Sequence, residues 1–508
     1  MVDYSKKLIQ GTAIVLIFSI VSTLIGYIFK LVLAKTTSIS DIGLFFSVLG
    51  LISAWSFFRD LGLSDALIYY IPRFLVNKSK AKLKSSIIFT LLVQILIGTL
   101  FFFIMILFSK YLAQNYFKDG NAYYLVIFLS FYFIIDGIHE VLLRIFHGYQ
   151  NIFFQQAFDF CFQTLSMFFI LLVIFFKKNI IFFGVAYILA DLIAIILFFS
   201  IFIRRLSPNF FKIKTKIDWK LNKKLLKYSL PVMVGSIAES GFYQQTIILL
   251  TFFVGLEAVG YYVMVRSIAK LSLFIYKASG RVFMPMISEL WKRNKFKKLN
   301  FLFNQQIILN YLVAVPLTLS FLFFSEIVLR ILYGENFVVA SLILKVFAIY
   351  VLFELFNNLF YMLSMSTGYP KISRDNAYVK FFFNLIANLL LIPYIGLLGA
   401  VIADLISVIF ACVHMLYINT KKIHMRLPLK ELFFISVSSF FFIITIYFLR
   451  LFLTLNPYME LMVLLPIASF IYLAFVFLFK LINGKMINNI IKKMTNDKVD
   501  IPFLTRFD

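Results

Sequence analysis

The chain is dominated by long apolar runs that follow one another with only short polar breaks. A hydrocarbon core needs roughly 20 apolar residues per helical crossing, so each run is long enough to span a bilayer. Because lipid offers no partner to backbone amides, such runs must be helices or closed barrels, and uniform runs without strand-like alternation exclude a barrel. The predicted spans are 8–33, 42–58, 86–108, 122–145, 152–176, 180–203, 229–254, 259–283, 301–324, 340–365, 377–393, 397–418, 432–453 and 461–479.

Composition agrees with an integral membrane protein. Hydrophobic residues make up 62% of the 508 positions and charged residues 14%, which leaves too little polar surface to coat a water-soluble particle. Mean hydropathy is +0.95. The first run is too long for a signal-peptide core and lacks a small-residue cleavage pattern, so we expect it to remain as a helix.

The net charge of +26 is compatible with a nucleic-acid surface or with a topology signal. Placing both termini in the cytoplasm puts the basic stretches 204–227 and 292–298 inside and leaves few cations outside, which is the positive-inside pattern of a cell-membrane protein. Nucleic acid is then an unnecessary partner, whereas anionic lipids are an expected one. Cys161 and Cys412 both fall within predicted spans, so neither a disulfide nor a metal site is expected.

Short motifs recur in order in the two halves of the chain. The letters ADLI occur at 190–193 and again at 403–406, and glycine landmarks pair Gly43 with Gly260 and Gly148 with Gly368. We therefore expect an all-α membrane fold of fourteen helices: a six-helix lobe (1–212), a second lobe of the same orientation (213–425), and two helices with a basic tail (426–508). Parallel repeats place a cavity at the lobe interface, where rocking gives alternating access.

Charges inside spans indicate what passes through such a cavity, since burying an ionisable group in lipid costs at least about 2.5–3.5 kcal/mol. In a continuous helix over 259–283, four cations would fall on one face. Two further cations are Lys30, on a polar face of the first span, and Arg59, near the position that corresponds to Lys277 in the repeat. The alternative is that the cations reach the membrane surface or pair with acids on neighbouring helices. Arginine and lysine at intervals favour a phosphate or diphosphate ligand. The four cations are Arg266, Lys270, Lys277 and Arg281.

Several other polar residues within spans are candidates for gating, packing or coupling. Asp136, Glu140 and Arg144 are one helical turn apart and suit either a gate or an internal ion-pair network. The repeated Asp191 and Asp404 favour a shared packing or capping role over substrate contact.

An oxygen-rich group could bind a coupling cation, sodium being the natural choice for hard oxygen ligands. Its candidates are Glu239, Asn384 and Asn388. Asparagines within spans also serve as hydrogen-bonding links between helices. Protons are the other candidate coupling ion, and no further cofactor or metal is expected.

The stretch GYIFKLVLAKTTSISDIGLFFSVLGLISAWSFFRDLGLSDALIYYIPRF and the later GLLGAVIADLIS resemble the polysaccharide or oligosaccharide flippase family of the multidrug/oligosaccharidyl-lipid/polysaccharide (MOP) superfamily. The resemblance implies a MATE-like fold and transport of polyprenyl-phosphate-linked or diphosphate-linked oligosaccharides to the outer leaflet for surface glycan assembly. We expect a monomer whose pathway lies within one chain, and glycan-assembly enzymes are its expected partners.

The alternative on the same scaffold is a multidrug exporter of organic cations, and the 19% aromatic content leaves that reading open. Nothing in the chain indicates an enzyme, because the outer loops are short and poor in acidic or metal-binding groups. A purely structural membrane protein would leave the cations within the spans unexplained.

Overall fold

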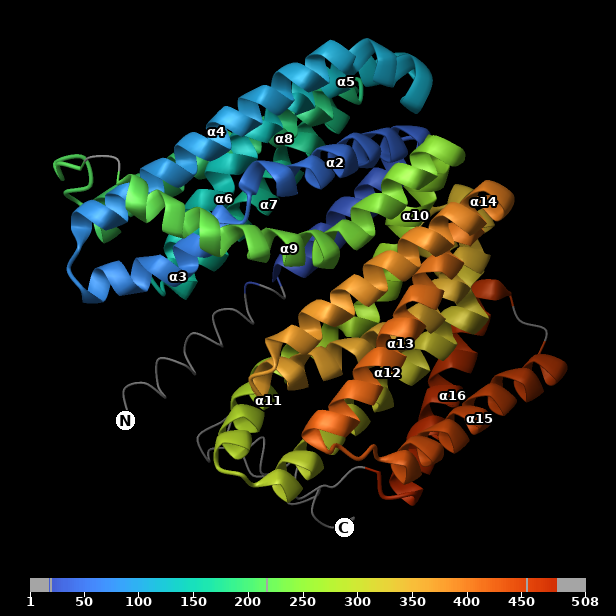
Figure 1. Ribbon diagram of the computed structural model, residues 1–508. Helices are drawn as coiled ribbons and strands as arrows, with labels where there is room; N and C mark the ends of the chain where they lie inside the picture. Colours follow the sequence, from blue (N-terminus) through green and yellow to red (C-terminus); the bar gives the residue numbers. More distant parts are fainter. Residues whose placement is uncertain (1–17, 19–20, 216–217, 454–455, 482–508) are drawn as a thin grey trace. The chain divides into compact units, whose positions relative to one another are not determined.

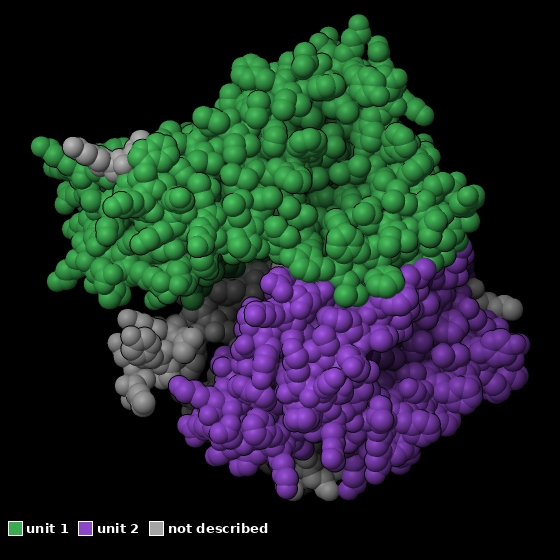
Figure 2. All heavy atoms as spheres, in the orientation of Figure 1, with its two compact units in different colours: residues 1–264, 377–403 green, residues 265–376, 404–508 purple. Residues whose placement is uncertain are grey.

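The computed structural model describes residue 18 and residues 21–215, 218–453 and 456–481. Within these ranges the regular structure is entirely helical (Figure 1). The side chains of nine helical residues also lie outside the described part, and three of them, Glu239, Lys277 and Arg281, are predicted site residues. The chain divides into two compact units, coloured separately in Figure 2. The units are residues 1–264 with 377–403 and residues 265–376 with 404–508.

The first unit holds the N-terminal helices. After a helical segment at 21–36, its elements are α2 (Ile39–Asp60), α3 (Leu63–Val76), α4 (Lys80–Tyr111), η1 (Leu112–Phe117), α5 (Gly120–Ser130), α6 (Tyr132–Gly148), α7 (Ile152–Phe175), α8 (Ile181–Ile201), η2 (Phe202–Leu206), α9 (Trp219–Phe253) and most of α10 (Leu256–Ala269). Polar N-caps begin several of these helices: the Ser38 hydroxyl accepts from the Asp41 amide, and the Asp218 carboxylate accepts from the Leu221 amide.

The second unit holds the C-terminal helices. Its elements are η3 (Lys270–Leu273), α11 (Phe274–Lys292), α12 (Phe296–Tyr333), η4 (Glu335–Ala340), α13 (Ser341–Ser366), both ends of α14 (Pro370–Ile423), α15 (Leu429–Phe452) and α16 (Pro457–Leu478). The middle of α14, residues 377–403, belongs to the first unit.

Ten helical stretches among the described residues are long and apolar enough to cross a membrane. One of them, α14, has 54 residues and would be about 80 Å long if straight, far more than a bilayer requires. Its backbone leaves the helical region at Ile395 and Gly396, and a Cβ on Gly399 would lie 2.5 Å from the Leu391 carbonyl oxygen. The chain therefore reverses there, as the separate predicted spans 377–393 and 397–418 require. The multi-pass membrane architecture is confirmed, whereas the count of fourteen helices is not.

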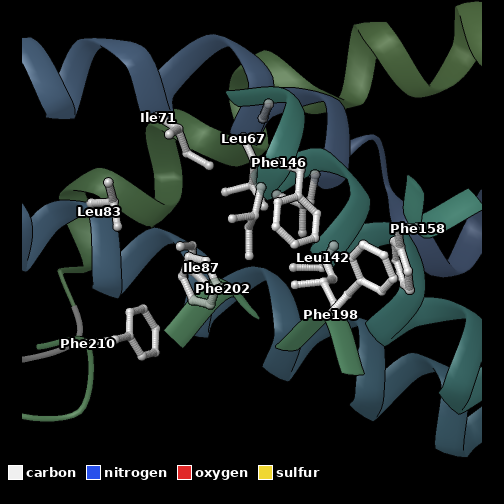
Figure 3. Packing of buried hydrophobic residues seen from close by; sticks show 14 of the residues in the cluster. Leu67, Ile71, Leu83, Ile87, Leu142, Phe146, Phe158, Phe198, Phe202 and Phe210 are labelled. Carbon is white, nitrogen blue, oxygen red and sulfur yellow. The ribbon is translucent and has the colours of Figure 1, made fainter. Parts of the chain in front are cut away.

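The first unit is held together by an apolar cluster (Figure 3). Leu67 and Ile71 of α3 pack with Leu142 and Phe146 of α6, and Phe158 joins them from α7. Buried phenylalanines from η2 and the segment after it extend the cluster to the start of α4. A second cluster joins α12 to α15 and α16, with Phe442 and Tyr472 fully buried. These cores contain only a small share of the 66 phenylalanines, and many others are exposed on the helices, where lipid would cover them.

Candidate functional site

The second predicted span continues into a helix break directly after Arg59. Helix α2 ends at Asp60, Leu61 and Gly62 adopt the left-handed region with φ of 50° and 70°, and α3 restarts at Leu63. Position 62 requires glycine for two reasons. Its φ is positive, and a Cβ would lie 2.4 Å from the Ser229 carbonyl oxygen of α9. The break places Arg59 in the last turn of α2, next to the start of α3.

The span that the sequence predicts as its repeat counterpart is also interrupted, which corrects the prediction of one continuous helix over 259–283. Helix α10 ends at Ala269, Lys270–Leu273 forms a 3-10 turn, and α11 begins at Phe274. A 3-10 turn advances about 120° per residue instead of 100°, so the predicted single cationic face does not run unbroken from Arg266 to Arg281. Interrupted helices at matching places in two repeats are the best general indicator of a transporter binding site.

Arg59 forms a buried ion pair inside the first unit. Its Nη2 donates to the Asp136 carboxylate at 2.7 Å, and its Nη1 donates to the Phe133 carbonyl oxygen of α6 at 2.8 Å. The arginine side chain is 2% exposed and the aspartate side chain 23%. The Nε atom of Arg59 is buried without a hydrogen-bond partner among the described residues. The Nε–H group of Arg59 is thus an unused donor, and the carboxylate of Asp136 is partly exposed.

Two further polar groups lie around this pair. The Gln94 side chain of α4 donates to the carboxylate of Asp60 and, at 2.7 Å, to the hydroxyl of Ser64. Arg144 holds Glu140 through hydrogen bonds of 2.8 Å from Nε and 2.6 Å from Nη2. Its Nη1 lies 3.5 Å from Asp65 at the start of α3. Asp136, Glu140 and Arg144 thus all pair inside the first unit, with partners on α2, α3 and α6.

The two repeated aspartates are both fully buried, and each lies beside a basic side chain of its own unit. Asp191 lies 2.5 Å from Nδ1 of His139, whose ring stacks on Phe158 and whose other nitrogen is 3.8 Å from Asp159. Asp404 lies 3.9 Å from Nη1 of Arg266, whose guanidinium carbon is 5.9 Å from the Tyr350 ring centre. Both aspartates therefore contact basic side chains in the interior of their units, a histidine in one case and an arginine in the other.

A group of buried amides and a hydroxyl joins α9 to the first arm of α14. The Oδ1 of Asn384 accepts from Gln245 at 2.7 Å, from Asn388 at 2.8 Å and from Thr246 at 3.2 Å. Asn388 also donates to the Thr246 hydroxyl at 3.0 Å. The side-chain oxygens of Gln245 and Asn388 are buried without a hydrogen-bond donor among the described residues. Two unpaired oxygens of this kind suit a hard cation or a water molecule.

The remaining predicted site residues are not gathered into one described group. Lys30 is partly buried in the helical segment 21–36, and Lys270 is exposed in the 3-10 turn. The side chains of Lys277, Arg281 and Glu239 lie outside the described residues. Sequence reasoning missed Asp60, His139 as a partner of Asp191, and the Gln245–Thr246 pair. A usable signal was available for each, because they are polar residues within or beside predicted spans.

Comparison with known proteins places the fold. The chain is 26% identical to an uncharacterized membrane protein of Methanocaldococcus jannaschii over 97% of its own length and 99% of that protein. It is 19% identical to a probable low-salt glycan biosynthesis flippase, Agl15, of Haloferax volcanii, over 54% of this chain and 59% of the relative.

Among solved structures, the lipid II flippase MurJ in an inward closed conformation matches with a TM-score of 0.76 and 17% identity, over 91% of this chain and 98% of MurJ. An inward-facing multidrug resistance MATE family transporter of the MOP superfamily matches with a TM-score of 0.63 and 14% identity, over 82% and 94%. These likenesses show the fold. The family model described as polysaccharide biosynthesis protein matches residues 8–291, more than half of the chain, so the chain belongs to this family and has the MOP-superfamily fold.

Proposed function

We propose that this protein is a flippase that moves a polyprenyl-phosphate-linked or diphosphate-linked oligosaccharide from the inner to the outer leaflet by alternating access, for surface glycan assembly. Family membership and the flippase among its relatives support a transporter over an enzyme. The observation that carries the proposal is the helix break at Arg59, a buried arginine with an unused donor and a partly exposed carboxylate partner.

The proposed step at this site is an exchange of anions. Guanidinium groups bind phosphate and carboxylate in the same bidentate manner, so a phosphate oxygen can take the place of Asp136 on Arg59. Transferring a bare phosphate into hydrocarbon would cost tens of kcal/mol by Born reasoning, and a fixed guanidinium replaces part of the lost hydration. The lipid tail stays in the bilayer, and no covalent chemistry is needed.

Coupling to an ion is the second part of the proposal. The unpaired oxygens of Gln245 and Asn388 support a sodium site in the first unit. A charge from Glu239 at such a site stays a prediction from the sequence. The roles of Lys30, Arg266, Lys270, Lys277 and Arg281 toward the head group, and the cytoplasmic location of both termini, stay predictions.

A thermal-shift measurement separates this proposal from a multidrug exporter. Purified protein in detergent is heated with a polyprenyl diphosphate oligosaccharide, with the same lipid lacking phosphate, or with the lipophilic cation tetraphenylphosphonium. We expect stabilisation by the diphosphate lipid alone, since bound ligand stabilises by mass action. Stabilisation by the cation but not by the diphosphate lipid would support the exporter and refute the flippase.

A further inference from the structure

The segment that joins α8 to α9 is packed against its own unit. Phe210 is buried in the apolar cluster of the first unit, where its ring lies 5.4 Å from that of Phe202 (Figure 3). The Nζ of Lys84 donates to the carbonyl oxygens of Phe211 at 3.1 Å and Ile213 at 2.8 Å. Thr215 donates to the Ala81 carbonyl oxygen at 3.1 Å. The described parts of the segment are therefore fixed to the start of α4.

This packing presents a particular set of side chains outward, which we call the linker surface (the outward side chains of residues 204–215 and 218–227). Phe211, next to the buried Phe210, is 68% exposed, and Trp219 at the start of α9 is 74% exposed. Around them, the lysines and arginines of the linker surface are exposed, whereas Leu221 and Leu225 of the same helix turn inward. The surface thus combines two exposed aromatic rings with many cations.

The cations of the linker surface have no carboxylate partner among the described residues. The single acid, Asp218, is engaged in capping α9, where its carboxylate accepts from the Leu221 amide at 3.1 Å. The positive charges of these side chains repel one another, so an anionic partner would stabilise the surface. The surface also lies where candidate membrane spans end, because the span Ile181–Leu206 stops at its beginning and the span Lys80–Phe117 starts beside it.

From these observations we infer that the linker surface is a docking site for the anionic head groups of the membrane in which the protein sits, with Phe211 and Trp219 inserted at the boundary between head groups and acyl chains. Lysine attracts anionic lipid within a Debye length of the surface, and tryptophan favours the interfacial layer. An acidic soluble protein would satisfy the lysines but would not require two bare aromatic rings at the end of the spans. The inference does not depend on the proposed function.

Tryptophan fluorescence tests this inference, because the chain has only three tryptophans. Replacing Trp55 and Trp291 by phenylalanine leaves Trp219 as the sole reporter in the full-length protein. The protein is reconstituted in phosphatidylcholine vesicles containing phosphatidylglycerol, with bromine on the acyl chains of one lipid or of the other. We expect bromine on the acyl carbons closest to the head group to quench Trp219. Brominated phosphatidylglycerol should quench at least about threefold more per mole than brominated phosphatidylcholine.

Charge variants complete the test. Lys212, Lys214 and Lys220 are replaced together by glutamine, which should abolish the preference for phosphatidylglycerol while leaving quenching by neutral lipid. The matched control replaces the exposed Lys295, Lys297 and Lys298 of the second unit by glutamine, which changes net charge equally and should leave the preference intact. Raising the salt concentration to about 0.5 M should reduce the preference in the parent protein. Absence of quenching by either lipid, or equal quenching by both, overturns the inference and leaves a soluble acidic partner as the alternative.

Discussion

Two buried arginines of this chain differ in how their carboxylate partners are enclosed. Asp136, the partner of Arg59, has a side chain that is 23% exposed, whereas Asp404, the partner of Arg266, is fully buried. A carboxylate with access to water can leave its arginine at modest cost, because water solvates it when the pair opens. For a fully buried carboxylate such as Asp404 the cost of leaving the arginine is larger, because water does not reach it. The first pair is suited to exchange partners with a ligand, and the second to hold helices together.

The comparison is tested most strongly by Asp404→Ala. The substitution takes a buried carboxylate away from beside the buried guanidinium of Arg266, so we expect a loss of about 3–5 kcal/mol in the free energy of unfolding. Thermal and denaturant unfolding in detergent measures this loss.

The matched control is Glu289→Ala, which breaks an exposed i,i+4 pair with Arg293 and should change stability by less than about 1 kcal/mol. If Asp404→Ala were as stable as this control, the structural role of the second pair would be wrong.

The helix break beside Arg59 is tested by Gly62→Ala. The new Cβ meets the Ser229 carbonyl oxygen and the backbone φ stays positive, so we expect a loss of about 1–3 kcal/mol in stability and a clear fall in transport. Gly26→Ala is the control, because a Cβ there meets nothing within 4 Å and alanine favours a helix. Equal behaviour of the two variants in unfolding and transport would show that the break is not needed.

The amide group of the first unit is tested by Asn388→Ala. We expect a loss of about 1–2 kcal/mol, because Thr246 and Asn384 lose a shared donor. Unfolding is measured in sodium chloride and in choline chloride. If the group binds sodium, the parent protein is more stable in sodium chloride and the variant shows no difference. A sodium effect of the same size in both proteins would place the cation elsewhere.

The smallest change in stability is expected for Asp136→Asn. The amide oxygen of the asparagine and the Phe133 carbonyl oxygen can both still accept from the buried guanidinium of Arg59, so unfolding should shift by only about 1 kcal/mol. Binding of a polyprenyl diphosphate should strengthen, because the competing carboxylate is gone. Weaker binding, measured by titration with thermal or fluorescence detection, would contradict the exchange of anions at Arg59.

Membrane class and family were predictable from the sequence, because they depend on hydropathy and on recognisable motifs, whereas the repeat of two six-helix lobes stays a prediction. The directions in which the side chains of a span point were harder to predict. A regular rotation of 100° per residue predicted one cationic face from Arg266 onward, but the 3-10 turn at Lys270–Leu273 interrupts that rotation. The turn contains neither glycine nor proline, so the sequence does not indicate it.

The partners of the two repeated aspartates could not be predicted from the sequence either. The two ADLI motifs place Asp191 and Asp404 alike, yet one faces a histidine of α6 and the other an arginine of α10. Three-dimensional packing decides which cation meets each acid, and no short sequence window contains that information. The Gly62 break, by contrast, was marked by a glycine directly after the Arg59–Leu61 stretch.

The central claim, that Arg59 binds the phosphate of the transported lipid, is tested most directly by transport in proteoliposomes. The parent protein is compared with Arg59→Gln and with the double variant Arg59→Gln/Asp136→Asn, and the appearance of polyprenyl diphosphate oligosaccharide in the outer leaflet is followed over time. We predict that the double variant regains the stability lost by Arg59→Gln, because no charge is left unpaired, but still transports at least about tenfold more slowly than the parent. Transport by the double variant at the parent rate would show that Arg59 only neutralises Asp136, and would contradict the account.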